Sequence, residues 1–151
     1  MLHLNLLNLT RAKIFPAPFK KILKYGEEII SQLKEKNGEI NLIITNNKTI
    51  HELNRKYRKI DHETDVLSFS YFQPTKSTSK KECKNNLPQL IGEIFIALPV
   101  ARKQALEFKH SLTAELNKLF AHGLLHIFDF DHVTKKDFKQ MEKSEKEILL
   151  T

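Results

Sequence analysis

The chain has 151 residues, 40% of them hydrophobic and 28% charged, which is the composition of a single soluble globular domain covering 1–151. One cysteine, Cys83, excludes a disulfide framework and a cysteine-based zinc site, and no apolar stretch is long enough to cross a bilayer. The formal net charge of +7 favours a polyanionic partner such as nucleic acid. Because the N-terminus lacks the pattern of a secretory leader, we expect a cytoplasmic protein.

The first half of the chain alternates strands and helices. The pattern predicts a strand over 2–9, a helix over 18–33 and a second strand over 39–45. Asn47 is expected to cap a short helix that ends near Tyr57, and we expect the Tyr57 ring in the core.

The second half begins with two strands and then becomes helical. The strands are predicted over 66–71 and 90–97, on either side of a polar, exposed loop at 73–88. Three helices are expected to follow, over 99–108, 111–127 and 134–149. This order predicts an α+β fold, a mixed sheet of about four strands with about five helices packed on it.

Three histidines fall within eleven residues in the segment HGLLHIFDFDH, at 122, 126 and 132. His122 and His126 are four apart on a predicted helix, so both side chains project from one face and can reach one ion. His132 can join them only if the helix ends after Ile127 and the chain folds back. Three neutral histidines on Zn²⁺ leave one position open for water, the pattern of a catalytic zinc. The alternative is that these are ordinary core or surface histidines.

The spacing of the histidines resembles that of metzincin peptidases, H-E-x-x-H-x-x-G-x-x-H, with two differences. The glutamate that serves as general base is Gly123 here, and the turn glycine is Asp129. A peptidase without its base would be crippled, so a protease is a poor interpretation. Gly123 within a helix indicates either close packing against a strand or a site that a side chain would crowd.

A basic segment, LNRKYRKIDHETDVLSFS (53–70), precedes the third strand. It places Arg55, Lys56, Arg58 and Lys59 near the end of a helix. Arginine suits phosphate because its planar fork donates two parallel hydrogen bonds. The alternative for the lysines is a solvated basic face. Asp61, Thr64 and Asp65 are expected to shape the turn into the strand.

Together, the two segments resemble the YbeY family of bacterial rRNA maturation factors, whose signatures are approximately L-N-x-x-Y-R-x-x-D-x-x-T-D-V-L-S-F-P and H-G-x-L-H-L-x-G-Y-D-H. The first is matched by Leu53, Asn54, Tyr57, Arg58, Asp61, Thr64, Asp65, Val66, Leu67, Ser68 and Phe69. The second is matched by His122, Gly123, Leu125, His126, Asp131 and His132. The segment IGEIFIALPVARKQA (91–105) resembles the stretch that lies between them in the family.

The resemblance implies a zinc-dependent, single-strand-specific endoribonuclease that matures the 3′ end of the small-subunit rRNA and acts in ribosome quality control. It implies one Zn²⁺ per chain, bound at the end of a helix by His122, His126 and His132. It also implies that Arg58 is the functionally important arginine and that single-stranded rRNA and the small ribosomal subunit are partners. Asp131 is a candidate for orienting a ligand histidine.

Four residues depart from the family signatures: Ser70 replaces proline, Ile127 leucine, Asp129 glycine and Phe130 tyrosine. Asp129 bears on how the turn brings His132 round. Two alternative functions stay open at this point. One is a non-catalytic assembly factor in which zinc only stabilises the fold, and the other is a metallohydrolase that acts on peptides or small phosphoesters.

Overall fold

The computed structural model describes residues 2–32, 37–72 and 89–128, together with 135–136, 139–140 and 142–143. Its elements are β1 (Leu2–Asn8), the 3-10 helix η1 (Ala17–Phe19), α1 (Lys20–Gln32), β2 (Gly38–Thr45), α2 (Asn47–Arg58), β3 (Val66–Ser70), β4 (Gln89–Ala97), α3 (Leu98–Glu107) and α4 (Leu112–Phe128). The predicted α+β order is confirmed over these residues. The loop 73–88 and most of the predicted helix 134–149 lie outside them.

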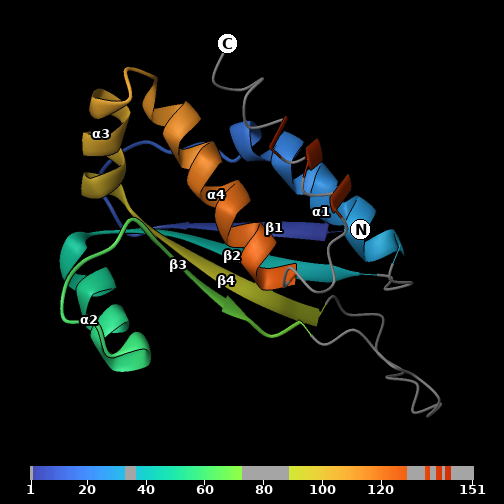
Figure 1. Ribbon diagram of the computed structural model, residues 1–151, viewed down its shortest axis with the longest axis horizontal. Coiled ribbons are helices and arrows are strands. Elements are labelled where there is room, and N and C mark those ends of the chain that lie inside the picture. Colours follow the sequence, from blue (N-terminus) through green and yellow to red (C-terminus); the bar gives the residue numbers. More distant parts are fainter. Residues whose placement is uncertain are drawn as a thin grey trace.

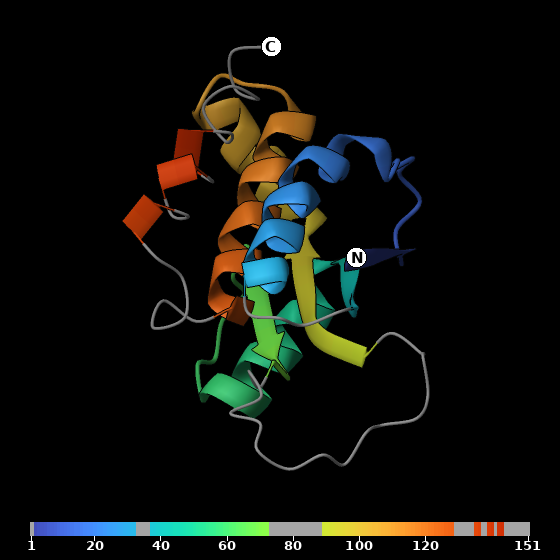
Figure 2. The ribbon, with the colours of Figure 1, turned by 90° about the vertical axis from the view of Figure 1, so that its right-hand side faces the viewer.

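The four strands form one mixed sheet in the order β1-β2-β4-β3. β1 and β4 run parallel to β2, while β3 pairs antiparallel with β4 and forms an edge of the sheet. In Figure 1, α1 and α4 lie over one side of the sheet and α2 lies on the other. Figure 2 shows α1 and α4 next to each other, with β3 beneath α4 and α2 farther below. None of the described helices is long and apolar enough to cross a membrane.

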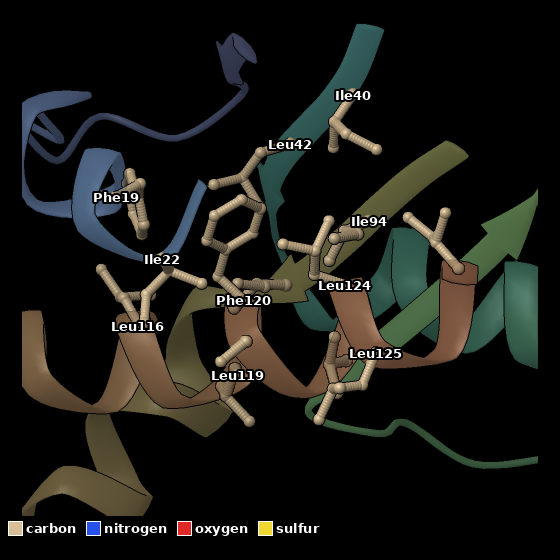
Figure 3. Packing of buried hydrophobic residues seen from close by; sticks show 14 of the residues in the cluster. Phe19, Ile22, Ile40, Leu42, Ile94, Leu116, Leu119, Phe120, Leu124 and Leu125 are labelled. Carbon is tan, nitrogen blue, oxygen red and sulfur yellow. The ribbon is translucent and has the colours of Figure 1, made fainter. Parts of the chain in front are cut away.

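The main core lies between the sheet and the helices α1 and α4. Figure 3 shows Phe120 and Leu124 of α4 facing Leu42 and Ile94 of the sheet, and all four side chains are buried. The ring of Phe19 packs edge to face on Phe120, with 5.4 Å between the centroids. Each such side chain contributes about 1.5–3 kcal/mol by leaving water. A smaller cluster around Ile50, Leu67 and Ala97 joins α2 to the opposite side of the sheet.

Two glycines let α4 approach the sheet closely. A Cβ on Gly123 would lie 2.8 Å from Cγ2 of Ile94 and 2.9 Å from Oγ of Ser68. A Cβ on Gly92 would lie 2.4 Å from Cδ1 of Ile127. Real Cβ atoms are not found this close to other atoms, so any side chain here would push the helix from the strands. Close packing against a strand therefore explains the glycine within the helix.

Of two helix caps predicted from the sequence, the structure confirms one and corrects the other. Ser111 accepts a hydrogen bond from the backbone N–H of Ala114 at 3.1 Å, so the predicted cap of α4 is confirmed. The predicted cap at Asn47 is wrong, because Asn46 caps α2 and accepts from the N–H of Thr49 at 2.9 Å. Either asparagine satisfies the capping preference, and the extended backbone of residue 46 decides between them.

Candidate metal centre

His122 and His126 lie side by side on the exposed surface of α4, in its last two turns. Their rings meet edge to face with centroids 4.6 Å apart, and their Nε2 atoms are separated by 3.1 Å. Two imidazole nitrogens that each lie about 2.1 Å from one ion are themselves about 3–3.4 Å apart. The spacing of these two nitrogens therefore fits a shared metal ion without rearrangement of the helix.

The third predicted ligand, His132, lies outside the described residues, as do Asp129, Phe130 and Asp131. Over the part of the chain that the structure describes, no group of three or more His, Cys, Asp or Glu side chains could hold a metal. The structure thus places two of the three predicted ligands together, and the complete three-histidine set stays a prediction.

The C-terminal end of α4 is fastened to the edge strand. The hydroxyl of Ser70, the last residue of β3, donates a hydrogen bond to the carbonyl of Ile127 at 2.6 Å. This bond satisfies one of the carbonyls that a helix end leaves unpaired. The same helix end carries partial negative charge, which favours a cation beside His126. Ser70, noted in the sequence only as a departure from the family, therefore helps to hold the turn that carries the histidines.

Arg58, the predicted catalytic arginine, is the last residue of α2 and is exposed. Its neighbour Tyr57 packs on Phe69 of β3, with ring centroids 5.2 Å apart. Ser68, the residue before Phe69, points the other way and faces Gly123, next to His122. The helix that ends at Arg58 and the helix that carries the histidines therefore contact β3 from its two sides, as the positions of α2 and α4 in Figure 1 show.

The predicted core position of Tyr57 is wrong, because 57% of the residue is exposed. The residue does belong to the apolar stripe that includes Ile50 and Leu53, which is why its spacing suggested the core. Its turn is the last of α2, where the ring contacts Phe69 on one side and leaves its other side in solvent. The sequence carried no clear signal for this exposure, because the basic neighbours Lys56 and Arg58 project from other faces of the helix.

The turn between α2 and β3 is held by the side chains that the sequence singled out. Asp65 accepts from the N–H of Val66 at 2.8 Å and from the side-chain amide of Gln104 at 3.2 Å, which ties the start of β3 to α3. The buried amide of Asn54 donates to the carbonyl of His62 at 2.9 Å. These bonds fix the end of α2, and with it Arg58, relative to the sheet.

Known proteins resemble this chain over most of its length. The family model described as Endoribonuclease YbeY matches residues 10–151. Curated relatives named Endoribonuclease YbeY include one from Brevibacillus brevis, 36% identical over 81% of this chain and 79% of the relative. Others come from Desulforamulus reducens, at 36% over 86% of each chain, and Caldicellulosiruptor bescii, at 40% over 78% of this chain and 75% of the relative.

A solved structure has the same fold. The solution structure of TM1509 from Thermotoga maritima superposes with a TM-score of 0.54 at 23% identity, over 98% of this chain and 89% of that one. The family model covers the two segments that carry Arg58 and the histidines, and the curated relatives cover most of the sequence. The chain therefore belongs to the Endoribonuclease YbeY family.

Proposed function

We propose that this chain, as a single domain over 1–151, is a metal-dependent endoribonuclease that cleaves single-stranded RNA during rRNA maturation. The observation that supports this most directly is the pair of exposed imidazoles, with Nε2 atoms 3.1 Å apart, at the end of α4. Membership of the family supplies the substrate class, since the relatives are named endoribonucleases. The net charge of +7 suits an RNA substrate.

The metal that we propose is one Zn²⁺ per chain, held by His122, His126 and His132. Imidazole nitrogen is a preferred zinc donor, and the two placed histidines have the spacing that a shared ion needs. An ion bound there supplies Lewis acidity at the phosphodiester. The chain contributes the rigidity, because Gly123 and the bond from Ser70 to Ile127 press the histidine-bearing turns against β3 and β4.

Arg58 has a separate role in this proposal. Its guanidinium, exposed at the end of α2, binds a phosphate of the RNA and offsets the negative charge that develops during cleavage. Because its guanidinium stays protonated and has no acceptor atom, the arginine is not a metal ligand. Replacing Arg58 should therefore lower turnover while the zinc content is retained.

The proposed setting is the cytoplasm, with the small ribosomal subunit as the partner that presents the RNA. A non-catalytic assembly factor remains the rival, in which the metal only stabilises the fold. The rival predicts that removing the metal unfolds the domain broadly. The exposed position of His122 and His126, outside both hydrophobic clusters, favours the enzyme.

The proposal is tested by cleavage of a single-stranded RNA and of its duplex form, with zinc-loaded, chelated and zinc-restored protein. We expect cleavage of the single strand that disappears on chelation, returns with zinc and is much slower on the duplex. Arg58→Ala should lower kcat/KM at unchanged zinc content. Loss of zinc from Arg58→Ala would contradict the role of Arg58 in phosphate binding. A cleavage rate that chelation does not change would contradict the role of the metal. Chelated protein that unfolds broadly would favour the assembly factor.

A further inference from the structure

A group of aromatic rings lies on the side of the sheet that carries α2, opposite the side that α1 and α4 cover. Tyr57 packs edge to face on Phe69, and Phe69 packs in the same way on Phe95, with centroids 5.2 Å and 5.8 Å apart. Tyr71 follows Phe69 by two residues, so both side chains point to this side of the sheet. Tyr57 is 57% exposed and Tyr71 is 49% exposed. Both tyrosines are therefore open to solvent, and the ring of Tyr57 is supported by two further rings beneath it.

Side-chain hydrogen bonds across β4, β2 and β1 hold Tyr71, the residue after the end of β3, in place. Its hydroxyl donates to Oε1 of Glu93 at 3.0 Å, and Oε2 of Glu93 accepts from Nδ2 of Asn41 at 3.2 Å. Oδ1 of Asn41 in turn accepts from Nδ2 of Asn5 at 3.1 Å. Partial burial, and next Glu93, raise the pKa of Tyr71, so the phenol keeps the proton that it donates. A ring fixed in this way loses little conformational freedom when a ligand stacks on it.

Basic side chains surround Tyr57 in the last turn of α2. Arg55, Lys56, Arg58 and Lys59 are all exposed at the end of α2. The ammonium of Lys56 lies 5.2 Å from the centroid of the Tyr57 ring, within the range of a cation–π contact. Exposed aromatic rings beside cations are the combination that binds single-stranded nucleic acid, because the rings stack on bases while the cations bind phosphates. A duplex offers phosphates but keeps its bases stacked internally.

We propose that Tyr57 and Tyr71 form a stacking site for unpaired bases of the RNA substrate. The site lies on the opposite side of β3 from His122 and His126, so the bound strand passes around this edge of the sheet and Arg58 holds its backbone on the way. The inference rests on the proposed function and deepens it, because it makes base stacking at this site the origin of the preference for single strands.

The test measures binding of a nuclease-resistant single-stranded RNA to the metal-containing protein, by fluorescence anisotropy. Removing one stacked ring by Tyr57→Ala or Tyr71→Ala should raise Kd at least about fivefold. Tyr57→Phe keeps the ring and should bind within about twofold of wild type. Tyr71→Phe keeps the ring but loses the hydroxyl bond to Glu93, so its Kd should lie between those of wild type and Tyr71→Ala. The matched control is Phe108→Ala, since Phe108 is also 57% exposed and also has a lysine, Lys118, over its ring. Its Kd should not change.

Inorganic polyphosphate provides a second probe that has phosphates but no bases. Tyr57→Ala and Tyr71→Ala should leave its binding unchanged, whereas Lys56→Ala should weaken the binding of both polyphosphate and RNA. The chain has three tyrosines and no tryptophan, so stacking should also quench tyrosine emission. The double variant Tyr57→Phe/Tyr71→Phe should lose that quenching and still bind RNA.

Three results would overturn the stacking site. The first is a Kd for RNA that neither alanine substitution changes, and the second is an equal loss of affinity for RNA and polyphosphate. The third is a loss of RNA affinity in Phe108→Ala as large as in the tyrosine variants. Cleavage measured in the same preparations separates this failure from that of the proposed function. If the wild-type protein cleaves RNA and the Kd is the same in Tyr57→Ala and Tyr71→Ala, the stacking site alone is overturned. A wild-type protein that neither binds nor cleaves RNA overturns both.

Discussion

Replacing Gly123 with alanine tests how closely α4 must approach the sheet. The added Cβ would lie 2.8 Å from Cγ2 of Ile94 and 2.9 Å from Oγ of Ser68, whereas carbon atoms in ordinary contact are about 3.5–4.0 Å apart. Ile94 is fully buried, so it has little room to give. Overpacking of this kind costs about 1–3 kcal/mol, while alanine in place of glycine within a helix returns about 1 kcal/mol. Subtracting this gain from the middle of the overpacking range, we expect Gly123→Ala to lower the free energy of unfolding by about 1 kcal/mol.

Urea and thermal unfolding of the variant measure this loss, and about 1 kcal/mol corresponds to about 3 °C in Tm for a domain of this size. Gly123→Val should cost more, because its methyl groups extend the overlap. Ser68→Ala removes one of the two close atoms, so the double variant should lose less than the sum of its parts. Gly123→Ala with wild-type or higher stability would refute the claim that contact with β3 and β4 requires glycine here.

Three further predictions concern groups around the sheet. Ser70→Ala should cost about 0.5–1.5 kcal/mol by removing the hydroxyl bond to the end of α4, whereas Ser70→Thr should retain it; equal urea midpoints for all three proteins would contradict this. Because partial burial, and then Glu93, raise the pKa of Tyr71, the unfolded chain loses that phenol proton first, so stability should fall as the pH rises through the raised pKa. Tyr71→Phe should flatten this alkaline fall, and an identical profile would argue against it. His110→Ala should cost about 1–3 kcal/mol by leaving the fully buried carboxyl group of Glu115 without the imidazole that hydrogen-bonds to it. Adding Glu115→Leu should recover most of that loss in urea unfolding, and no recovery would exclude an unpaired carboxylate as its cause.

Much of the fold follows from short-range patterns in the sequence. The apolar runs in β2 and β4 and the stripe on α4 identify their own elements, because burial on one or both faces dictates which residues can stand there. The choice of Asn46 over Asn47 as the cap depends on the local backbone of two equivalent residues, so composition does not decide it. The sequence left two explanations for Gly123, and only the positions of Ile94 and Ser68 on neighbouring strands separate them.

The sequence predicted the histidine pair of the candidate site better than it predicted the end of α2. The helical spacing of His122 and His126 was sufficient to bring their nitrogens together, as the separation of 3.1 Å confirms. The exposure of Tyr57 was not predictable from spacing, because it depends on how far the last turn of α2 extends past Phe69. Nor does the sequence reveal that α2 and α4 cover opposite sides of the sheet, since that follows from how each helix packs on the strands.

The most direct test of the central claim is a titration of zinc into metal-free protein while the rate of single-stranded RNA cleavage is followed. We expect a rate that rises linearly and levels off at about one equivalent of zinc, the capacity of one three-histidine site. We expect no rise for His126→Ala, whose fold should survive because the residue is exposed. Cleavage by the metal-free protein, or an equal rise in His126→Ala, would contradict the assignment of the histidine pair to a catalytic metal.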